Sequence, residues 1–354
     1  MTDALSSPTP IVLTMGEPAG IGPDIAIAAF AQRDVHALPP LVMIACPELL
    51  SRRAAQLGLS VDLAVTSLPE AADADWNVEI ASLTATSLPV VPLTDCLDDV
   101  VAGTPSARTG LQVVSSIERA VVAVTSGVAR AMVTNPIAKD VLYETGFAFP
   151  GHTEFLGALA SRLTNAQSRR PVMMLACDEL RVIPATIHIP LAEVPRALTP
   201  QLLRETIETV DIALRSDFGC ASPRITLTGL NPHAGESGAI GLEEMEVISP
   251  VVETLRAEGY DLTGPLPGDT CFHAEARARS DAVIAMYHDQ ALIPIKTLAF
   301  DRGVNVTLGL PFVRTSPDHG TAFGIAGTGQ ANSRSLIEAV LMADAIAASR
   351  RANA

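Results

Sequence analysis

The chain has 354 residues, of which 48% are hydrophobic and 4% aromatic, and its formal net charge is −15. The length favours two domains over one, and the apolar content is sufficient for a folded core. The acidic charge argues against nucleic acid or an anionic membrane as a partner, because both repel negative charge. No run of uncharged apolar residues reaches the length of about 18 that a transmembrane helix needs.

The N-terminal sequence and the cysteines both favour a cytoplasmic protein. The first ten residues lack the basic and apolar regions of a secretory signal. The cysteines include no C-x-x-C pair and stand at positions 46, 96, 177, 220 and 271. An odd set without a pattern, in a chain of this length, predicts reduced thiols in the cytosol.

Short apolar runs alternate with helical patterns along the chain, which predicts an α/β fold with mostly parallel sheets. Strands are expected at 11–15, 41–45, 131–134, 172–176, 182–187, 224–229 and 282–287. Helices are expected at 23–29, 47–57, 109–125, 199–215, 241–259 and 333–348. The stretch 60–108 is rich in Pro, Ser, Thr and Asp, so we expect it to be the least regular part.

A glycine-rich segment, Gly-Glu-Pro-Ala-Gly-Ile-Gly-Pro at 16–23, joins the first predicted strand to a helix. Glycines allow close backbone approach, and a helix N-terminus favours an anion. The spacing is neither that of a P-loop nor that of the Rossmann fingerprint. Alone, the motif fits a tight structural turn as well as an anion site.

Three histidines each follow an apolar, strand-like run, namely His188, His233 and His288. In a parallel α/β sheet, ligands bind beyond the carboxyl ends of the strands. Three imidazoles delivered there could bind one divalent metal and leave a fourth position open, as in catalytic zinc sites. For one histidine alone, a hydrogen-bonded strand end is the simpler interpretation, but the three together favour a metal site.

The region 281–332 is the densest in polar side chains of functional type. Lys296 and Arg314 are isolated cations in apolar or glycine-rich surroundings, which favours an anionic ligand over a surface role. Earlier in the chain, His152 and Thr153 stand at a predicted helix start, where they could bind a phosphate or carboxylate or cap the helix.

The sequence resembles the 4-hydroxythreonine-4-phosphate dehydrogenase family of pyridoxal phosphate biosynthesis. The resemblance spans nearly the whole chain in order. The matching segments are Gly-Glu-Pro-Ala-Gly-Ile-Gly-Pro-Asp (16–24), Thr-Asn-Pro-Ile-Ala-Lys (134–139), Gly-His-Thr-Glu-Phe (151–155), Thr-Ile-His-Ile-Pro-Leu (186–191), Leu-Asn-Pro-His-Ala-Gly-Glu (230–236), Gly-Pro-Leu-Pro-Gly-Asp-Thr (264–270), Met-Tyr-His-Asp-Gln (286–290) and Gly-Leu-Pro-Phe-Val-Arg-Thr-Ser-Pro-Asp-His-Gly-Thr-Ala (309–322).

This resemblance implies a two-domain fold like that of isocitrate and isopropylmalate dehydrogenases, with mostly parallel sheets and an active-site cleft between domains. We expect a cofactor-side domain at 1–133 with 300–354, and a metal, substrate and dimerisation domain at 134–299. A homodimer with its active site at the subunit interface is also implied.

The resemblance further implies roles for individual residues. The metal, expected to be Zn²⁺ with Mg²⁺ or Co²⁺ as alternatives, is bound by His188, His233 and His288. The phosphorylated substrate is contacted by His152, Thr153, Lys296, Asn305 and Arg314. The adenosine of NAD or NADP is held by His319, Gly320, Thr321, Ala322 and Asn332.

The implied chemistry is hydride transfer from a metal-bound substrate hydroxyl to NAD(P)⁺, which yields a β-keto acid that loses carbon dioxide. Asp269, Asp289 and Lys139 are candidates for relaying the proton. Two departures from the family pattern are Ala291, where glycine is more common, and the long region 60–108.

Two alternatives stay open at this point. The first is a dehydrogenase of the same fold that acts on another diol, either 4-phosphothreonate, phosphoerythronate or an aromatic cis-dihydrodiol carboxylate. The second is a zinc hydrolase, which would need no nucleotide cofactor.

Overall fold

The computed structural model describes residues 9–97, 99–149, 151–163 and 169–353, so most of the segment tested for a secretory signal lies outside it. The chain divides into two compact units. The first comprises Met1–Ser168 and Leu310–Ala347, and the second Arg169–Gly309 and Ala348–Ala354. The sequence-based division placed these boundaries earlier, at 133/134 and 299/300. Helices α6 (Lys139–Tyr143) and α7 (His152–Leu163) belong to the first unit because both pack against α5 (Gly110–Thr125).

Parallel strands form the sheet of the first unit, in the order β3-β4-β2-β1-β5-β12. The strands are β1 (Ile11–Thr14), β2 (Leu41–Ala45), β3 (Leu63–Val65), β4 (Leu88–Pro92), β5 (Ala131–Val133) and β12 (Arg314–Pro317). β1, β2 and β5 are buried along their whole length, which explains why each is a continuous apolar run.

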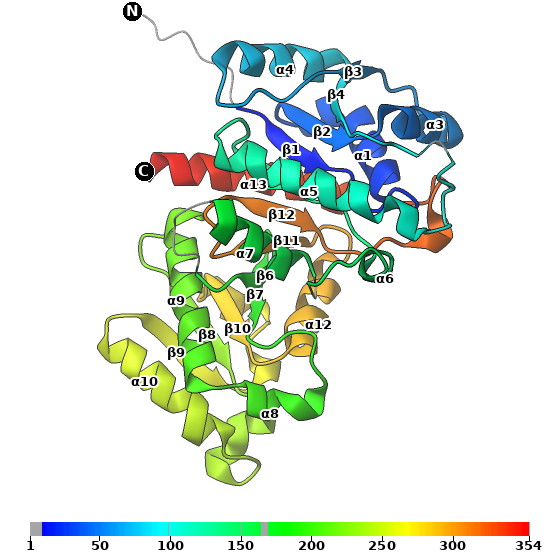
Figure 1. Ribbon diagram of the computed structural model, residues 1–354. Coiled ribbons are helices and arrows are strands. Elements are labelled where there is room, and N and C mark those ends of the chain that lie inside the picture. Colours follow the sequence, from blue (N-terminus) through cyan, green and yellow to red (C-terminus); the bar gives the residue numbers. More distant parts are fainter. Residues whose placement is uncertain (1–8, 98, 150, 164–168, 354) are drawn as a thin grey trace, which may run out of the picture. The chain divides into compact units, whose positions relative to one another are not determined.

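The longer helices beside this sheet are α1 (Gly22–Ala31), α3 (Pro47–Leu57), α4 (Ala74–Thr86), α5 and α13 (Arg334–Ala352), as Figure 1 shows. Part of the region 60–108 is more regular than predicted. It contains β3, α4 and β4, and α4 begins where the Asp73 carboxylate accepts hydrogen bonds from the backbone of Asp75 and Trp76. Elsewhere in this region, the described residues of 66–73 and 93–106 have no helix or strand.

The second unit has the strand order β11-β6-β7-β10-β8-β9. These are β6 (Val172–Cys177), β7 (Leu180–Pro184), β8 (Arg224–Thr228), β9 (Asp261–Leu266), β10 (Ala282–Ala285) and β11 (Val304–Leu308). β7, β10, β8 and β9 pair with one another in parallel, whereas β6 pairs antiparallel with β7 and β11. The prediction of an α/β fold with mostly parallel sheets is confirmed.

The helices of the second unit include α8 (Val194–Ala197), α9 (Pro200–Ser216), α10 (Ser249–Ala257), α11 (Ala274–Ala278) and α12 (His288–Ala299). α9 starts where the Thr199 hydroxyl accepts a hydrogen bond from Leu202 N, with Pro200 in the first turn. One core cluster packs α12, through Ala291, Ile295 and Ala299, onto β6, β7 and β10. Among the described residues, no helix combines the length and apolar character needed to cross a membrane.

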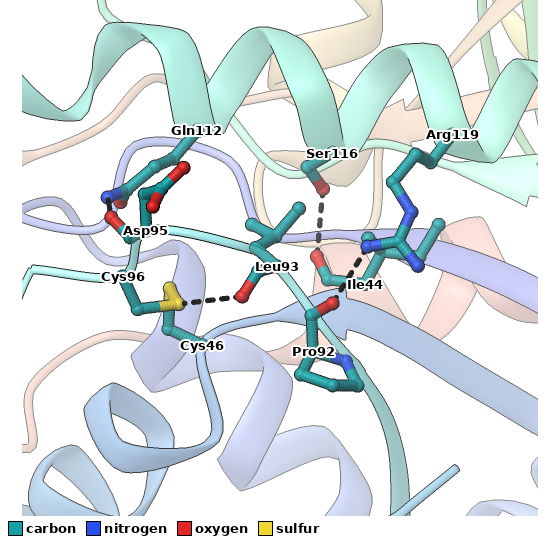
Figure 2. Close-up of a disulfide and its surroundings, with 9 residues drawn as sticks. All are labelled: Ile44, Cys46, Pro92, Leu93, Asp95, Cys96, Gln112, Ser116 and Arg119. Carbon is teal, nitrogen blue, oxygen red and sulfur yellow. Dashed lines mark hydrogen bonds between the residues drawn. A yellow bond between two sulfur atoms is a disulfide. The ribbon is translucent and has the colours of Figure 1, made fainter. Parts of the chain in front are cut away.

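The prediction that all five cysteines are reduced is wrong for one pair. Cys46 and Cys96 form a disulfide with a Cα–Cα distance of 5.8 Å (Figure 2). The two residues follow β2 and β4, which are adjacent parallel strands, so their carboxyl ends bring the sulfurs together. Spacing in the sequence could not reveal this, because 50 residues separate the two cysteines. Cys177, Cys220 and Cys271 are free.

Candidate active site

The three histidines of the predicted metal site all lie at one edge of the second sheet. β7, β10 and β8 are neighbours in that order and run parallel. His188, His288 and His233 each follow the carboxyl end of one of these strands by a few residues. This is the edge at which open α/β sheets bind ligands.

His188 and His288 lie side by side, with their ring centroids 5.8 Å apart. Two imidazoles on one zinc ion, with zinc–nitrogen bonds of about 2.0–2.1 Å, have ring centres about 5 Å apart, so the observed separation suits a shared ion. Both rings line a pocket of about 300 Å³. Its other lining residues are Thr186, Ile189, Leu191, Val194, Tyr287 and Asp289.

Asp289 contacts the ring of His288, since its Oδ1 lies 2.7 Å from His288 Nδ1. A proton on Nδ1 that is donated to this carboxylate leaves Nε2 as the metal-binding nitrogen. Asp289, proposed from the sequence as a proton relay, is therefore placed to orient the ring of His288.

Gln290 holds the carboxyl ends of β8 and β10 together. Its side-chain oxygen accepts hydrogen bonds from Thr228 Oγ1 (2.8 Å) and Met286 N (2.7 Å), and its amide nitrogen donates to Gly229 O (2.8 Å). Sequence reasoning gave Gln290 no role, although it follows His288 by two residues. An amide can donate and accept at once, which is what this junction requires.

His233 is carried by a loop with unusual backbone geometry. Its φ is +53°, and the left-handed conformation continues through Ser237. Non-glycine residues rarely adopt this conformation and tend to cluster at functional sites when they do. The buried carboxylate of Glu244 holds the loop start, because it accepts hydrogen bonds from Leu230 N (2.8 Å) and Asn231 N (2.7 Å). Sequence reasoning missed Glu244, which lies in no motif.

The donor set suits a divalent transition metal in kind and number, since three imidazoles come from one sheet edge. Within the described ranges, however, no three His, Cys, Asp or Glu side chains are close enough together to hold an ion. The structure thus places the rings of His188 and His288 side by side. His233 lies at the same sheet edge but not close enough to share an ion with both of them.

The remaining candidates of the second unit are dispersed. Asp269 is exposed in a short 3₁₀ turn, Gly268–Thr270. The Lys296 ammonium, on α12 two turns after His288, lies 5.3 Å from the centroid of the exposed Phe300 ring. Asn305 lies on β11, and its Oδ1 is buried without a hydrogen-bond partner.

A second cluster, in the first unit, gathers His152, Arg314 and Lys139. Burial lowers the pKa of His152 well below 6.5, and the charges of Arg314 and Lys139 lower it further. Burial also lowers the pKa of Arg314 to about 10, so the guanidinium stays charged at neutral pH. Arg314 is fixed by two hydrogen bonds from its Nε (3.1 Å) and Nη2 (2.6 Å) to Thr134 Oγ1.

This cluster has the properties of an anion site. His152 and Thr153 open the twelve-residue helix α7, whose N-terminus favours negative charge. The Nε2 atom of His152 is buried and has no hydrogen-bond partner among the described residues. Two further buried atoms in the same condition belong to Glu17 and Asn135, of the matched segments 16–24 and 134–139. Burial is the main reason that the pKa of Glu17 is raised.

The glycine turn at 16–22 and the loop 318–332 are in contact. Ile21 N donates to Thr321 O (2.9 Å), and Gly327 N donates to the Asp24 carboxylate (2.6 Å). A Cβ on Gly20 would lie only 2.9 Å from Thr321 O, so glycine is required for this approach. From the sequence, the first segment was expected to be a tight turn or an anion site and the second to hold adenosine, and the structure makes them neighbours.

The candidate nucleotide-binding residues differ in their local roles. Gly320 is exposed and its Cβ position faces open space, whereas Ala322 has a left-handed φ of +42°. Asn332 Oδ1 accepts a hydrogen bond from Arg334 N (2.9 Å) at the start of α13. His319 Nδ1 lies 3.1 Å from Gly320 O.

Comparison with known proteins identifies the family. The family described as pyridoxal phosphate biosynthetic protein PdxA matches residues 37–343. The 4-hydroxythreonine-4-phosphate dehydrogenase of Xanthobacter autotrophicus is 51% identical over 341 residues, covering 96% of this chain and 94% of the relative. The protein of the same name from Methylorubrum populi is 52% identical over 343 residues, covering 97% and 95%.

Solved structures agree with this assignment. The 4-hydroxythreonine-4-phosphate dehydrogenase of Klebsiella pneumoniae superposes with a TM-score of 0.82 at 36% identity, covering 96% of this chain and 100% of that one. A terephthalate 1,2-cis-dihydrodiol dehydrogenase from Burkholderia xenovorans has a TM-score of 0.60 at 25% identity, covering 95% and 98%. The chain is an oxidoreductase that belongs to the PdxA family, the 4-hydroxythreonine-4-phosphate dehydrogenases.

Proposed function

We propose that the protein oxidises 4-phosphooxy-L-threonine to 2-amino-3-oxo-4-phosphooxybutanoate with NAD⁺ or NADP⁺, in a metal-dependent reaction of pyridoxine 5′-phosphate biosynthesis. The product is a β-keto acid, which decarboxylates to 3-amino-2-oxopropyl phosphate because its carbonyl accepts the electrons of the breaking bond. We further propose that the enzyme is a cytoplasmic homodimer with its active site at the subunit interface.

The observation that carries this proposal is the cluster formed by the buried Arg314, the partly buried His152 and the exposed Lys139. A phosphate needs charge and several donors, and a guanidinium, an ammonium, an imidazole and a helix N-terminus supply both. Thr134 fixes the guanidinium before any ligand arrives, which lowers the cost of ordering it. Thr153 adds a hydroxyl, and we assign Lys296 and Asn305 to the same substrate in the assembled dimer.

The divalent metal, for which we propose Zn²⁺ with Mg²⁺ or Co²⁺ as alternatives, would be held by His188, His233 and His288. When bound, such an ion lowers the pKa of a coordinated hydroxyl and so favours loss of its proton. Asp289 orients His288 through Nδ1, and Gln290 fixes the strand ends from which the ligands project. Asp269 and Lys139 remain candidates for proton transfer beside Asp289.

The nicotinamide cofactor would be bound in the first unit, where the loop 318–332 meets the glycine turn. Glycines let the backbone approach a ribose or purine closely, and His319 and Asn332 offer polar edges. Gly320 and Ala322 are exposed at this position, and Thr321 is partly exposed.

One alternative is supported by a specific comparison. The structural likeness to a terephthalate 1,2-cis-dihydrodiol dehydrogenase shows that this fold also occurs in an enzyme named for an aromatic diol. Other phosphorylated diols, 4-phospho-D-threonate and D-erythronate 4-phosphate, would suit the cation cluster equally well. A zinc hydrolase is not retained, since the family consists of dehydrogenases.

A substrate panel separates these possibilities. Purified enzyme is supplied with NAD⁺ or NADP⁺ and with 4-phosphooxy-L-threonine, 4-phospho-D-threonate, D-erythronate 4-phosphate or terephthalate cis-dihydrodiol, and NAD(P)H is followed by its absorbance. We expect the highest kcat/KM with 4-phosphooxy-L-threonine and none with the aromatic diol. Turnover of the aromatic diol alone would contradict the proposal.

A further inference from the structure

The disulfide joins two places that the sheet has already aligned. Cys46 follows β2 directly and precedes α3, while Cys96 lies four residues after β4. Leu93 N donates a hydrogen bond of ordinary length to Ala45 O (3.0 Å). This bond continues the pairing of β2 and β4 towards the sulfurs. Because the backbone holds the two cysteines together, their thiols stay adjacent after reduction and can form the bond again.

The helix α5 fixes both strand ends independently of the disulfide (Figure 2). Ser116 Oγ donates to Ile44 O (2.8 Å), and Arg119 Nη1 donates to Pro92 O (2.7 Å). Gln112 donates to Asp95 O, one residue before Cys96. Reduction is therefore expected to leave the sheet intact and to act on the chain beyond Cys96.

That chain reaches the proposed nucleotide-binding region. Gly103 N donates to Ala19 O (2.7 Å) in the glycine turn, and a Cβ on Gly103 would lie 3.0 Å from Phe323 O. The Thr109 hydroxyl lies 3.5 Å from Glu17 Oε1. Residues 99–106 have no helix or strand of their own and are mostly exposed, so their order depends on the two ends of the segment, the hydrogen bond of Gly103 and the ion pair of Asp99 with Arg108.

We propose that Cys46 and Cys96 form a reversible thiol–disulfide exchange site that controls how firmly residues 99–106 support the nucleotide-binding region. This inference rests on the proposed NAD(P)⁺ site. In the oxidised state the segment is tethered at Cys96 and at α5, which preorganises the glycine turn and the loop 318–332. In the reduced state the chain is still held at Asp95 by Gln112 but is no longer fixed at Cys96, so binding of the cofactor must order more chain.

The exchange partner is a dithiol. Cys46 is 2% exposed and Cys96 is partly exposed, so a thiolate of the reductant attacks the Cys96 sulfur and releases the Cys46 thiolate. The second thiolate of the reductant then displaces Cys96 and closes the reductant's own disulfide. Two electrons pass to the protein, and the two released thiolates take up the two protons of the dithiol. In a reducing cytosol, disulfides of this kind are typically transient and redox-sensing.

The first test compares NAD⁺ and NADP⁺ binding to oxidised and dithiothreitol-reduced protein by calorimetry. Alkylation after denaturation should label three cysteines in the oxidised protein, those free in the structure, and two more after reduction. We expect reduction to weaken cofactor binding by about three- to tenfold. Cys96→Ser and Cys46→Ser should match the reduced protein with or without dithiothreitol, and Cys220→Ser should match the wild type.

A second readout separates this inference from the proposed function. Hydrogen–deuterium exchange of residues 99–106 should increase on reduction in the wild type and in Cys220→Ser but not in Cys96→Ser. If neither form binds NAD(P)⁺, the proposed cofactor fails while the exchange result still decides whether the segment is tethered. Unchanged exchange, equal cofactor affinity in both states, or five labelled cysteines without reduction would each overturn the proposal.

Discussion

At the scale of single residues, Arg314 of the first unit is buried and held in place by hydrogen bonds to Thr134. A lysine would keep the charge but lose the planar fork, and it could not reproduce the two hydrogen bonds to Thr134. The sequence shows Arg314 as an isolated cation in a glycine-rich loop, which indicates an anion-binding role. Its burial and its partner could not be predicted, because Thr134 lies 180 residues away.

Arg314→Lys should raise KM for the phosphorylated substrate by roughly 10- to 100-fold, the equivalent of about 1.5–3 kcal/mol for a charged hydrogen bond. Steady-state kinetics and a thermal melt would be measured on the same preparation. Arg302→Lys, a change at a partly exposed arginine paired with Glu179, is the matched control. A folded Arg314→Lys enzyme with unchanged KM would remove Arg314 from the substrate site.

His152 should make the stability of the protein depend on pH. Its folded-state pKa lies well below the value of about 6.5 in the unfolded chain, so below that pH the unfolded state binds more protons. Stability is thus expected to fall as the pH decreases from 6.5 towards the folded-state pKa. Thermal melts between pH 7 and pH 5 should show a larger decrease for the wild type than for His152→Gln. Parallel curves for the two proteins would contradict this assignment.

At the scale of elements, hydrogen-bonded junctions position the histidines. Gln290 connects β8, β10 and α12, and Glu244 holds the start of the His233 loop. Hydrophobic periodicity and composition predicted most strands of the second unit, because buried parallel strands are continuous apolar runs. β9 and β11 escaped prediction, since both contain polar residues and β9 also contains a proline. The hydrogen bonds of Gln290 and Glu244 also escaped prediction, because most of their partners lie 13 or more residues away in the sequence.

Gln290→Leu keeps the size of the side chain but removes all three hydrogen bonds. We expect a loss of about 1–3 kcal/mol in the free energy of unfolding, as for buried polar groups left unsatisfied, together with lower bound metal. Denaturant titration and elemental analysis would measure the two effects. Gln201→Leu on the exposed face of α9 should change stability by less than about 0.5 kcal/mol. Full metal content in Gln290→Leu would show that the junction does not position the ligands.

Gly320→Val tests the loop 318–332 without disturbing the packing, because open space surrounds its Cβ position and its φ is not positive. The variant should melt like the wild type and show a KM for NAD(P)⁺ raised by about tenfold or more, with KM for the phosphorylated substrate little changed. Unaltered cofactor dependence in this folded variant would exclude the loop as the adenosine site.

At the scale of the whole molecule, the chain forms two units that are discontinuous in sequence. The family and the mostly parallel α/β fold could be predicted from the sequence, because the family's motifs occur in order between residues 16 and 322. The unit boundaries were harder to place, because α6 and α7 follow a strand of the first unit and pack back onto α5. The disulfide was inaccessible for a similar reason, as only the pairing of β2 with β4 brings its cysteines together.

We propose that this chain oxidises a phosphorylated hydroxy acid at a metal held by His188, His233 and His288. The most direct test of this proposal is the rate of NAD(P)H formation from 4-phosphooxy-L-threonine by metal-stripped enzyme, before and after one equivalent of Zn²⁺ is added. We expect that the stripped wild type is inactive, that Zn²⁺ restores turnover, and that His233→Ala is not restored. Full turnover by the stripped enzyme, or restoration of His233→Ala to the wild-type rate, would contradict the proposal.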